Sequence, residues 1–198
     1  MHPATRATTA ARATENARYL RRVLTRRACY TTSRPLHRNG PEGAHATIKS
    51  LELRRHARRD PNADRLSPEG RAQAEDVGRE LPGGYTAAFV SPAQRAAETL
   101  AWFLRGRGEP LPADHAVVPG LAGAEPGDPS PEGMSATVRA LLDQMPEGGR
   151  ALAVSHTPLI EHAAEGLTGS AIEALAECEG ILVTTEGDVL RVEELRTV

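Results

Sequence analysis

The sequence predicts a three-layer α/β/α sandwich with a mainly parallel sheet. From residue 48 onward, short apolar runs alternate with stretches of helical periodicity, which is the pattern of strands joined by covering helices. Helix-start signals directly follow two of the apolar runs, and Pro- and Gly-rich turns separate the elements. No apolar run approaches the roughly 18–20 residues that span a bilayer, so an integral membrane protein is excluded.

The first half of this pattern contains two strands, each followed by a helix. Each helix begins at a Ser-Pro pair and continues with apolar residues at helical spacing. The strands are expected at residues 48–53 and 86–90, and the helices at residues 67–81 and 91–104.

The second half begins with a Pro- and Gly-rich stretch and ends in a hairpin. Residues 151–154 form a continuous apolar run, which predicts a buried strand at residues 150–155. The other elements are expected at 117–118 (strand), 135–145 (helix), 158–167 (helix), and 180–185 and 188–193, two strands that turn at Glu186-Gly187.

Three predicted helices share one kind of start, with a hydroxyl residue at the N-cap and proline at the first helical position. These starts are Ser67-Pro68, Ser91-Pro92 and Thr157-Pro158. In an open α/β sheet, the carboxyl ends of the strands and the adjacent helix N-termini form the usual ligand crevice, and their free N–H groups favour an anion. The sequence therefore predicts a negatively charged ligand.

The charge of the chain is unevenly distributed. Residues 1–48 hold nine arginines against Glu15 and Glu42, a balance of +7, so the net charge of −2 leaves −9 for residues 49–198. We therefore divide the chain into a basic N-terminal extension, residues 1–48, and a folded domain, residues 49–198. The extension is too poor in apolar residues to offset its ordering entropy and is expected to be disordered. An organellar transit peptide and an arm that binds an acidic partner are the alternatives.

The composition excludes further classes of protein. The six aromatic residues provide few platforms for stacking bases, which argues against a single-strand nucleic-acid binder. Cys29 and Cys178 are too few for a disulfide framework or a cysteine zinc site, and they suggest a reducing compartment. Glu173, Glu177 and Glu179 are interpreted as the solvated face of a helix.

Basic side chains gather where the predicted strands end. Arg55 and His56 follow the first strand, Arg95 lies in the first turn of the helix after the second, and His156 follows the strand at residues 150–155. Guanidinium groups bind phosphoryl oxygens in pairs, and a neutral imidazole can attack phosphorus. Together these residues predict a phosphoryl-binding crevice, although each of them taken singly has an ordinary structural explanation.

Four motifs occur in an order that resembles the histidine phosphatase superfamily, also called phosphoglycerate-mutase-like. The motifs are Leu53-x-Arg55-His56-Ala57, Leu66-Ser67-x-x-Gly70, Ser91-Pro92-x-x-Arg95 and Val154-Ser155-His156. The resemblance covers about residues 48–193 and implies the phosphoglycerate-mutase-like fold. It also implies that His56 is the nucleophile that becomes phosphohistidine, while Arg55, Arg95 and His156 bind the phosphate. Ala57 replaces the glycine of the family's Arg-His-Gly motif, a change from the smallest residue to the next smallest.

The chain is most similar to the short branch of the superfamily that is related to phosphohistidine phosphatases. The short branch carries an arginine just before the helix that starts at Ser67, and Arg65 is its counterpart here, shifted by about one residue. Arg59 is the alternative as an extra phosphate ligand. Larger members carry a glutamate that protonates the leaving oxygen, and Gly123 occupies that position in this chain. Glu125 in the following loop is the candidate donor.

These observations predict a phosphatase that uses a phosphohistidine intermediate, acting on phosphohistidine or on small phosphorylated substrates. A phosphoglycerate-type mutase and a non-catalytic module that binds phosphoproteins are the alternatives. No cofactor and no metal are expected, because no paired metal-ligand spacing occurs and Arg55 and Arg95 would repel a cation. The expected partners are a phosphorylated small molecule or phosphoprotein, with neither a membrane nor nucleic acid. The expected location is cytoplasmic, or organellar if residues 1–48 are a transit peptide, and the sequence specifies no oligomeric state.

Overall fold

Strands and helices alternate through the computed structural model, which describes residues 47–124 and 127–197. These residues fall within one unit, His45–Val198. In chain order the elements are β1 (Ile48–Arg55), α2 (Pro68–Glu80), β2 (Ala87–Val90), α3 (Gln94–Arg107), β3 (Asp114–Val117), a 3-10 helix η1 (Pro119–Ala122), α4 (Pro131–Gln144), β4 (Arg150–Ser155), α5 (Leu159–Thr168), β5 (Gly180–Glu186) and β6 (Val189–Leu195).

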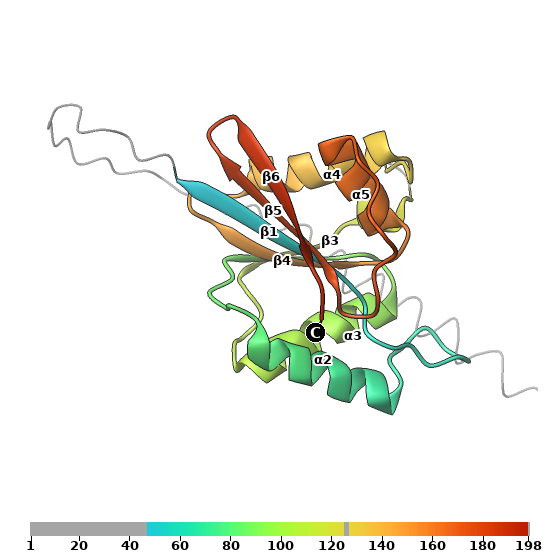
Figure 1. The fold of residues 1–198 in the computed structure, drawn as a ribbon. Coiled ribbons are helices and arrows are strands. Elements are labelled where there is room, and N and C mark those ends of the chain that lie inside the picture. The colour runs from blue at the N-terminus through green and yellow to red at the C-terminus, as the bar shows by residue number, and fades with distance from the viewer. Residues whose placement is uncertain (1–46, 125–126, 198) are drawn as a thin grey trace, which may run out of the picture. The chain divides into compact units, whose positions relative to one another are not determined.

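The six strands form one sheet in the order β3-β2-β4-β1-β5-β6. The strands β3, β2, β4 and β1 run parallel, and the hairpin β5-β6 adds to β1 in the antiparallel direction. Helices α2 and α3 cover one face and α4 and α5 the other (Figure 1). The predicted α/β/α sandwich with a mainly parallel sheet is confirmed.

Each face of the sheet has its own apolar core. Leu51 and Leu53 of β1 pack with the residues of α4 and α5, whereas Leu152 and Val154 of β4 pack with Phe103 and the other buried residues of α2 and α3. All five side chains are buried. Successive side chains of a strand point to opposite faces, so β4 contributes to both cores and must be apolar throughout.

The helix-start signals were correct at one of the three predicted positions. The Ser67 hydroxyl accepts a hydrogen bond from the Gly70 N–H and caps α2. By contrast, α3 begins at Gln94 after Ala93, because the Ser91 hydroxyl contacts an imidazole instead of the helix. The third prediction was also wrong, since Pro158 is itself the residue that precedes α5.

Other boundaries differ from the predictions for local reasons. Helix α4 starts one turn early, because Ser130 caps it by accepting from the Gly133 N–H. Strand β3 ends at Val117, and the final hairpin turns at residues 187–188 rather than 186–187. The acidic segment at residues 173–179 is not helical, and the side chain of Glu179 is buried, so its interpretation as a solvated helix face was wrong.

Two predictions concern residues outside the described part of the chain. The basic extension lies there except for its last two residues, and so does Glu125. The domain boundary at residue 49 stays a prediction. Among the helices of residues 47–124 and 127–197, none is both long enough and apolar enough to cross a membrane.

Candidate active site

Three parallel strands end side by side and place the predicted site residues together. Arg55 at the end of β1 pairs with Ser155 at the end of β4, and Val90 at the end of β2 pairs with the adjacent Val154. The residues that follow these ends are His56, His156 and Ser91. Because the carboxyl ends of parallel strands meet at one edge, side chains distant in sequence converge there.

The imidazole of His56 is buried and held in one tautomer. Its Nδ1 lies 2.7 Å from the backbone oxygen of Ala57. A carbonyl oxygen only accepts, so Nδ1 carries the proton and donates it, which leaves a lone pair on Nε2. Burial lowers the pKa of His56, the positive charges of Arg95 and Arg55 lower it further, and the bond to Ala57 opposes both. The ring is therefore neutral at pH 7, as a nucleophile at phosphorus must be.

The second imidazole, His156, is held at both nitrogens. Arg95 donates from Nη2 to Nδ1 at 3.1 Å, so the ring proton is on Nε2, which donates to Ser91 Oγ at 2.6 Å. Burial above all, and then the charge of Arg95 and the neighbouring His56, lower the pKa of His156 to about 4. The two imidazole centroids are 5.2 Å apart.

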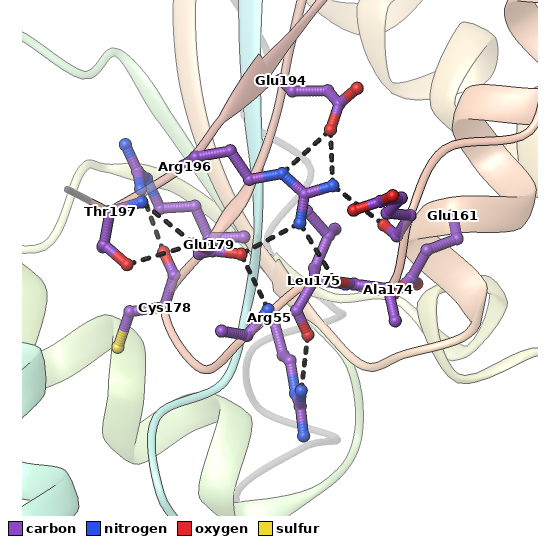
Figure 2. Close-up of polar contacts among 12 residues, drawn as sticks. Arg55, Glu161, Ala174, Leu175, Cys178, Glu179, Glu194, Arg196 and Thr197 are labelled. Atoms are coloured by element: carbon purple, nitrogen blue, oxygen red, sulfur yellow. Dashed lines mark hydrogen bonds and ion pairs between the residues drawn. The ribbon is translucent and has the colours of Figure 1, made fainter.

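Arg55 has one hydrogen-bonded side-chain nitrogen and Arg95 has two, and in each of them the buried Nε has no partner within the described residues. Arg55 donates from Nη1 to the backbone oxygen of Leu175 at 2.5 Å (Figure 2), and Arg95 donates from Nη1 to Asp64 Oδ1 at 2.5 Å. The Nε atoms of both are buried and have no hydrogen-bond partner within the described residues. A buried N–H without an acceptor is costly. An anion between these guanidinium groups would satisfy both.

Two residues of the site were not predicted for their roles. Ser91 was expected to cap α3, and instead it accepts from His156. Asp64 accepts from the backbone N–H of Gln94 at 3.0 Å and from Arg95, so it caps α3 from a distant loop. Burial opposes ionisation of Asp64, but these hydrogen bonds outweigh it and hold its pKa below the usual value. The partners lie far apart in sequence, so no local pattern could reveal them.

The remaining predicted site residues lie elsewhere or outside the described chain. Arg65 is exposed and forms an ion pair with Asp60 through Nε at 3.0 Å. Arg59 is exposed, and its backbone bridges to Leu66. Neither is brought to the imidazoles by a described contact, and Glu125 is not described. Within residues 47–124 and 127–197, no three His, Cys, Asp or Glu side chains form a group that could hold a metal ion.

Residues 45–128 match the family model of the histidine phosphatase superfamily (branch 1). The fold resembles that of phosphoglycerate mutase from Bacillus anthracis, with a TM-score of 0.61, 17% identity, and coverage of 76% of this chain and 94% of that one. It also resembles the protein histidine phosphatase SixA in complex with tungstate, with a TM-score of 0.59, 22% identity, and coverage of 74% and 96%. A phosphoserine phosphatase from Entamoeba histolytica has a TM-score of 0.61, 15% identity, and coverage of 75% and 97%. A search of curated proteins found no match.

Proposed function

The chain belongs to the histidine phosphatase superfamily, and from this premise we propose that it is a phosphatase whose nucleophile is His56. The Nε2 lone pair attacks phosphorus in line with the leaving group, and the bond between phosphorus and the leaving atom breaks with its electron pair on that atom. Water then attacks the phosphohistidine, which releases inorganic phosphate and returns the electron pair to Nε2. Covalent catalysis of this kind replaces one difficult displacement by two easier ones.

The observation that carries this proposal is the pair of unpartnered guanidinium nitrogens beside a neutral imidazole. The Nε atoms of Arg55 and Arg95 are buried without acceptors in the described chain, and the charges of both arginines act on His56 and on His156. Fixed donors of this kind stabilise the charge on a transferring phosphoryl group. A bound phosphoryl dianion also offsets the positive charges that lower the pKa of His156, so it favours protonation of that ring.

The preferred substrates are those whose leaving group departs without a proton. Asp64 contacts Arg95, but its pKa is held below the usual value, so it is ionised at pH 7 and cannot donate a proton. A general acid contributes roughly 10²–10⁴-fold when the leaving group is a poor one. Phosphohistidine and acyl phosphates need this help least, and we propose them as the substrate class. Glu125 is the alternative proton donor, and the aryl phosphate series below tests it.

Trapping the intermediate tests the mechanism. Brief incubation with acetyl phosphate, followed by alkaline quenching and mass spectrometry, should place one phosphoryl group on His56. His56→Ala should abolish both labelling and turnover while the far-UV circular dichroism is unchanged. His115→Ala is the matched control, because His115 is an exposed imidazole on β3 that hydrogen-bonds only the local Pro112 carbonyl in the described chain. Labelling or turnover that survives in His56→Ala would refute the assignment.

A series of aryl phosphates tests the substrate class. Without a proton donor, log(kcat/KM) should fall steeply as the pKa of the leaving phenol rises. The slope should be the same in Glu125→Gln. A shallow slope in the wild type that becomes steep in Glu125→Gln would instead identify Glu125 as the acid and remove the argument for activated substrates.

The same experiments separate the alternatives. A mutase keeps its phosphoryl group away from water and passes it to a second substrate, so exchange of phosphate between the positions of phosphoglycerate would mark that activity. A binding module would hold phosphate without labelling His56. The proposed phosphatase should label His56 transiently and release inorganic phosphate in stoichiometric amount with the leaving group.

A further inference from the structure

The segment at residues 173–179, the last part of the connection between α5 and β5, lies against the end of β1. The backbone N–H of Arg55 donates to the backbone carbonyl of Glu179 at 2.7 Å, and the backbone N–H of Cys178 donates to the backbone carbonyl of Arg55 at 3.2 Å. Arg54 Nη1 also donates to the Cys178 carbonyl at 3.0 Å. The segment is thus bonded to the two residues that precede His56.

The same segment sets the direction of the Arg55 side chain. Among the described residues, the Leu175 carbonyl is the one hydrogen-bond acceptor that the Arg55 guanidinium reaches, at 2.5 Å (Figure 2). The Leu175 side chain is buried, and its backbone N–H donates to Glu161 Oε1 at 2.9 Å. A shift of the Leu175 peptide would therefore reorient the Arg55 guanidinium, whose Nε is buried without a hydrogen-bond partner in the described chain.

Arg196, just beyond β6, holds the segment on one side of Leu175. Its Nη1 donates to the Ala174 carbonyl at 3.0 Å, and its Nη2 donates to the Glu173 carbonyl at 2.9 Å. Nη1 also donates to Glu179 Oε2 at 3.1 Å. These acceptors lie in different directions around one side chain. The planar guanidinium has N–H groups that point to all of them at once, and the ammonium group of a lysine cannot reproduce this arrangement.

Glu179 holds the segment on the other side. Its Oε2 accepts from the Ala176 N–H at 2.8 Å, and its Oε1 accepts from the Thr197 N–H at 3.0 Å. Burial opposes ionisation, but these N–H groups and Arg196 hold the pKa of Glu179 at about 2. The ion pair of Arg196 and Glu179, whose side chains are 34% and 9% exposed, therefore holds both the peptide that contains the Leu175 carbonyl and the peptide before it (Figure 2).

We propose that Arg196 and Glu179 are positioning residues that aim Arg55 at the phosphoryl group through the 173–179 segment. The proposal rests on the proposed function, because it assigns Arg55 to phosphate binding. Neither residue touches the substrate. Their effect is transmitted by the Leu175 carbonyl, so it depends on the length and donors of the side chain at position 55.

The first test compares Arg196→Ala with Arg191→Ala. Arg191 lies on β6 of the same hairpin and makes only a long, exposed ion pair with Glu186 in the described chain, at 3.8 Å, so it is a matched control. Misaligning a binding group by about 1 Å costs on the order of 10²-fold. Arg196→Ala should therefore lower kcat/KM and the affinity for inorganic phosphate by about 10- to 100-fold, with Arg191→Ala within about twofold of wild type. Arg196→Lys, which keeps the charge but loses the fork, should fall between them.

A double-mutant cycle separates positioning from general damage. If Arg196 acts through Arg55, then Arg196→Ala should change phosphate affinity by less than about twofold in an Arg55→Lys background. An equal loss in both backgrounds, or no loss in either, would overturn the proposal. If Arg196→Ala does not fold by circular dichroism, two variants in the same cycle decide the question: Arg196→Lys, and Thr197→Val, which loses the hydroxyl that donates to Glu179 Oε1 at 3.1 Å.

The readouts also distinguish this proposal from the proposed function. Phosphate affinity, measured by calorimetry, reports on Arg55 whether or not the protein turns over a substrate. If the protein turns over no substrate but Arg196→Ala still weakens phosphate binding as expected, the phosphatase proposal is refuted and the positioning role is kept. Normal turnover in Arg196→Ala would refute the positioning role and keep the phosphatase.

Discussion

Replacing Ser91 by alanine should impair the site through His156 and not through helix capping. Ser91 is 1% exposed, and its Oγ lies 2.6 Å from His156 Nε2. Because Nδ1 of the same ring accepts from Arg95, the proton is on Nε2, and Ser91→Ala leaves that N–H without its acceptor.

The magnitude follows from burial. Water cannot easily replace the hydroxyl at a position that is 1% exposed. An unsatisfied buried donor costs about 1–3 kcal/mol, so the free energy of unfolding should fall by that amount. The His156 ring then keeps only the contact with Arg95 among its described hydrogen bonds. If the poorer alignment of the ring reduces transition-state stabilisation by about 1.4 kcal/mol, kcat/KM falls tenfold.

Ser67→Ala is the matched control for this measurement. Ser67 is also buried and also precedes proline, but its hydroxyl accepts from the Gly70 N–H and caps α2. Loss of a cap costs about 1 kcal/mol. Urea unfolding at pH 7.5 should therefore show both variants destabilised, while kcat/KM for acetyl phosphate should fall only in Ser91→Ala. Equal kcat/KM in the two variants, whether both normal or both reduced, would refute the role of Ser91 as the partner of His156.

Further predictions concern protons, the Arg95 anchor and a close backbone approach. Burial and the adjacent guanidinium groups lower the pKa of His56, so its nucleophilic neutral form persists below pH 6.5. A plot of kcat/KM against pH should therefore have the midpoint of its acidic limb below pH 6.5, and a midpoint above 6.5 would contradict this prediction. Asp64→Asn should lower kcat/KM about tenfold and the free energy of unfolding by about 1 kcal/mol, because Arg95 and the start of α3 lose a charged acceptor. Unchanged kinetics would show that Asp64 does not hold Arg95 in its active position. Gly70→Ala should lower the free energy of unfolding by more than about 2 kcal/mol in urea titration, since its Cβ would lie 1.9 Å from the backbone oxygen of Arg58; a stable variant would contradict this approach.

Strands and strand-end residues were predictable because their signals are local. The strand predicted at residues 150–155 matches β4 at both ends. Its neighbour β1 was predicted two residues short, because Arg54 and Arg55 are charged although they are still paired with β4 and, for Arg54, with β5. The positions of His56 and His156 follow from these strands, since each imidazole comes directly after a strand end.

The partners of the site residues were not predictable from local patterns. The hydrogen bond from His156 to Ser91 joins residues 65 apart in sequence, and the one from Arg55 to the Leu175 carbonyl joins residues 120 apart. A backbone carbonyl has no signature in the sequence at all. The acidic residues at 173–179 show the same difficulty, because Glu179 has the composition of a solvated residue and yet is buried and paired with Arg196.

The order of apolar runs and turn signals thus determines the layered fold, the parallel strands and the edge of the sheet at which the arginines and histidines lie. The sequence alone predicts these features because each run and each turn signal depends on residues near one another in the chain. Packing decides which hydroxyl or carboxylate serves which partner. Ser67 and Ser91 both precede proline, and each hydroxyl can cap a helix or accept from a distant ring. The choice depends on whether an imidazole from another strand lies within reach, and that distance exists only once the sheet has formed.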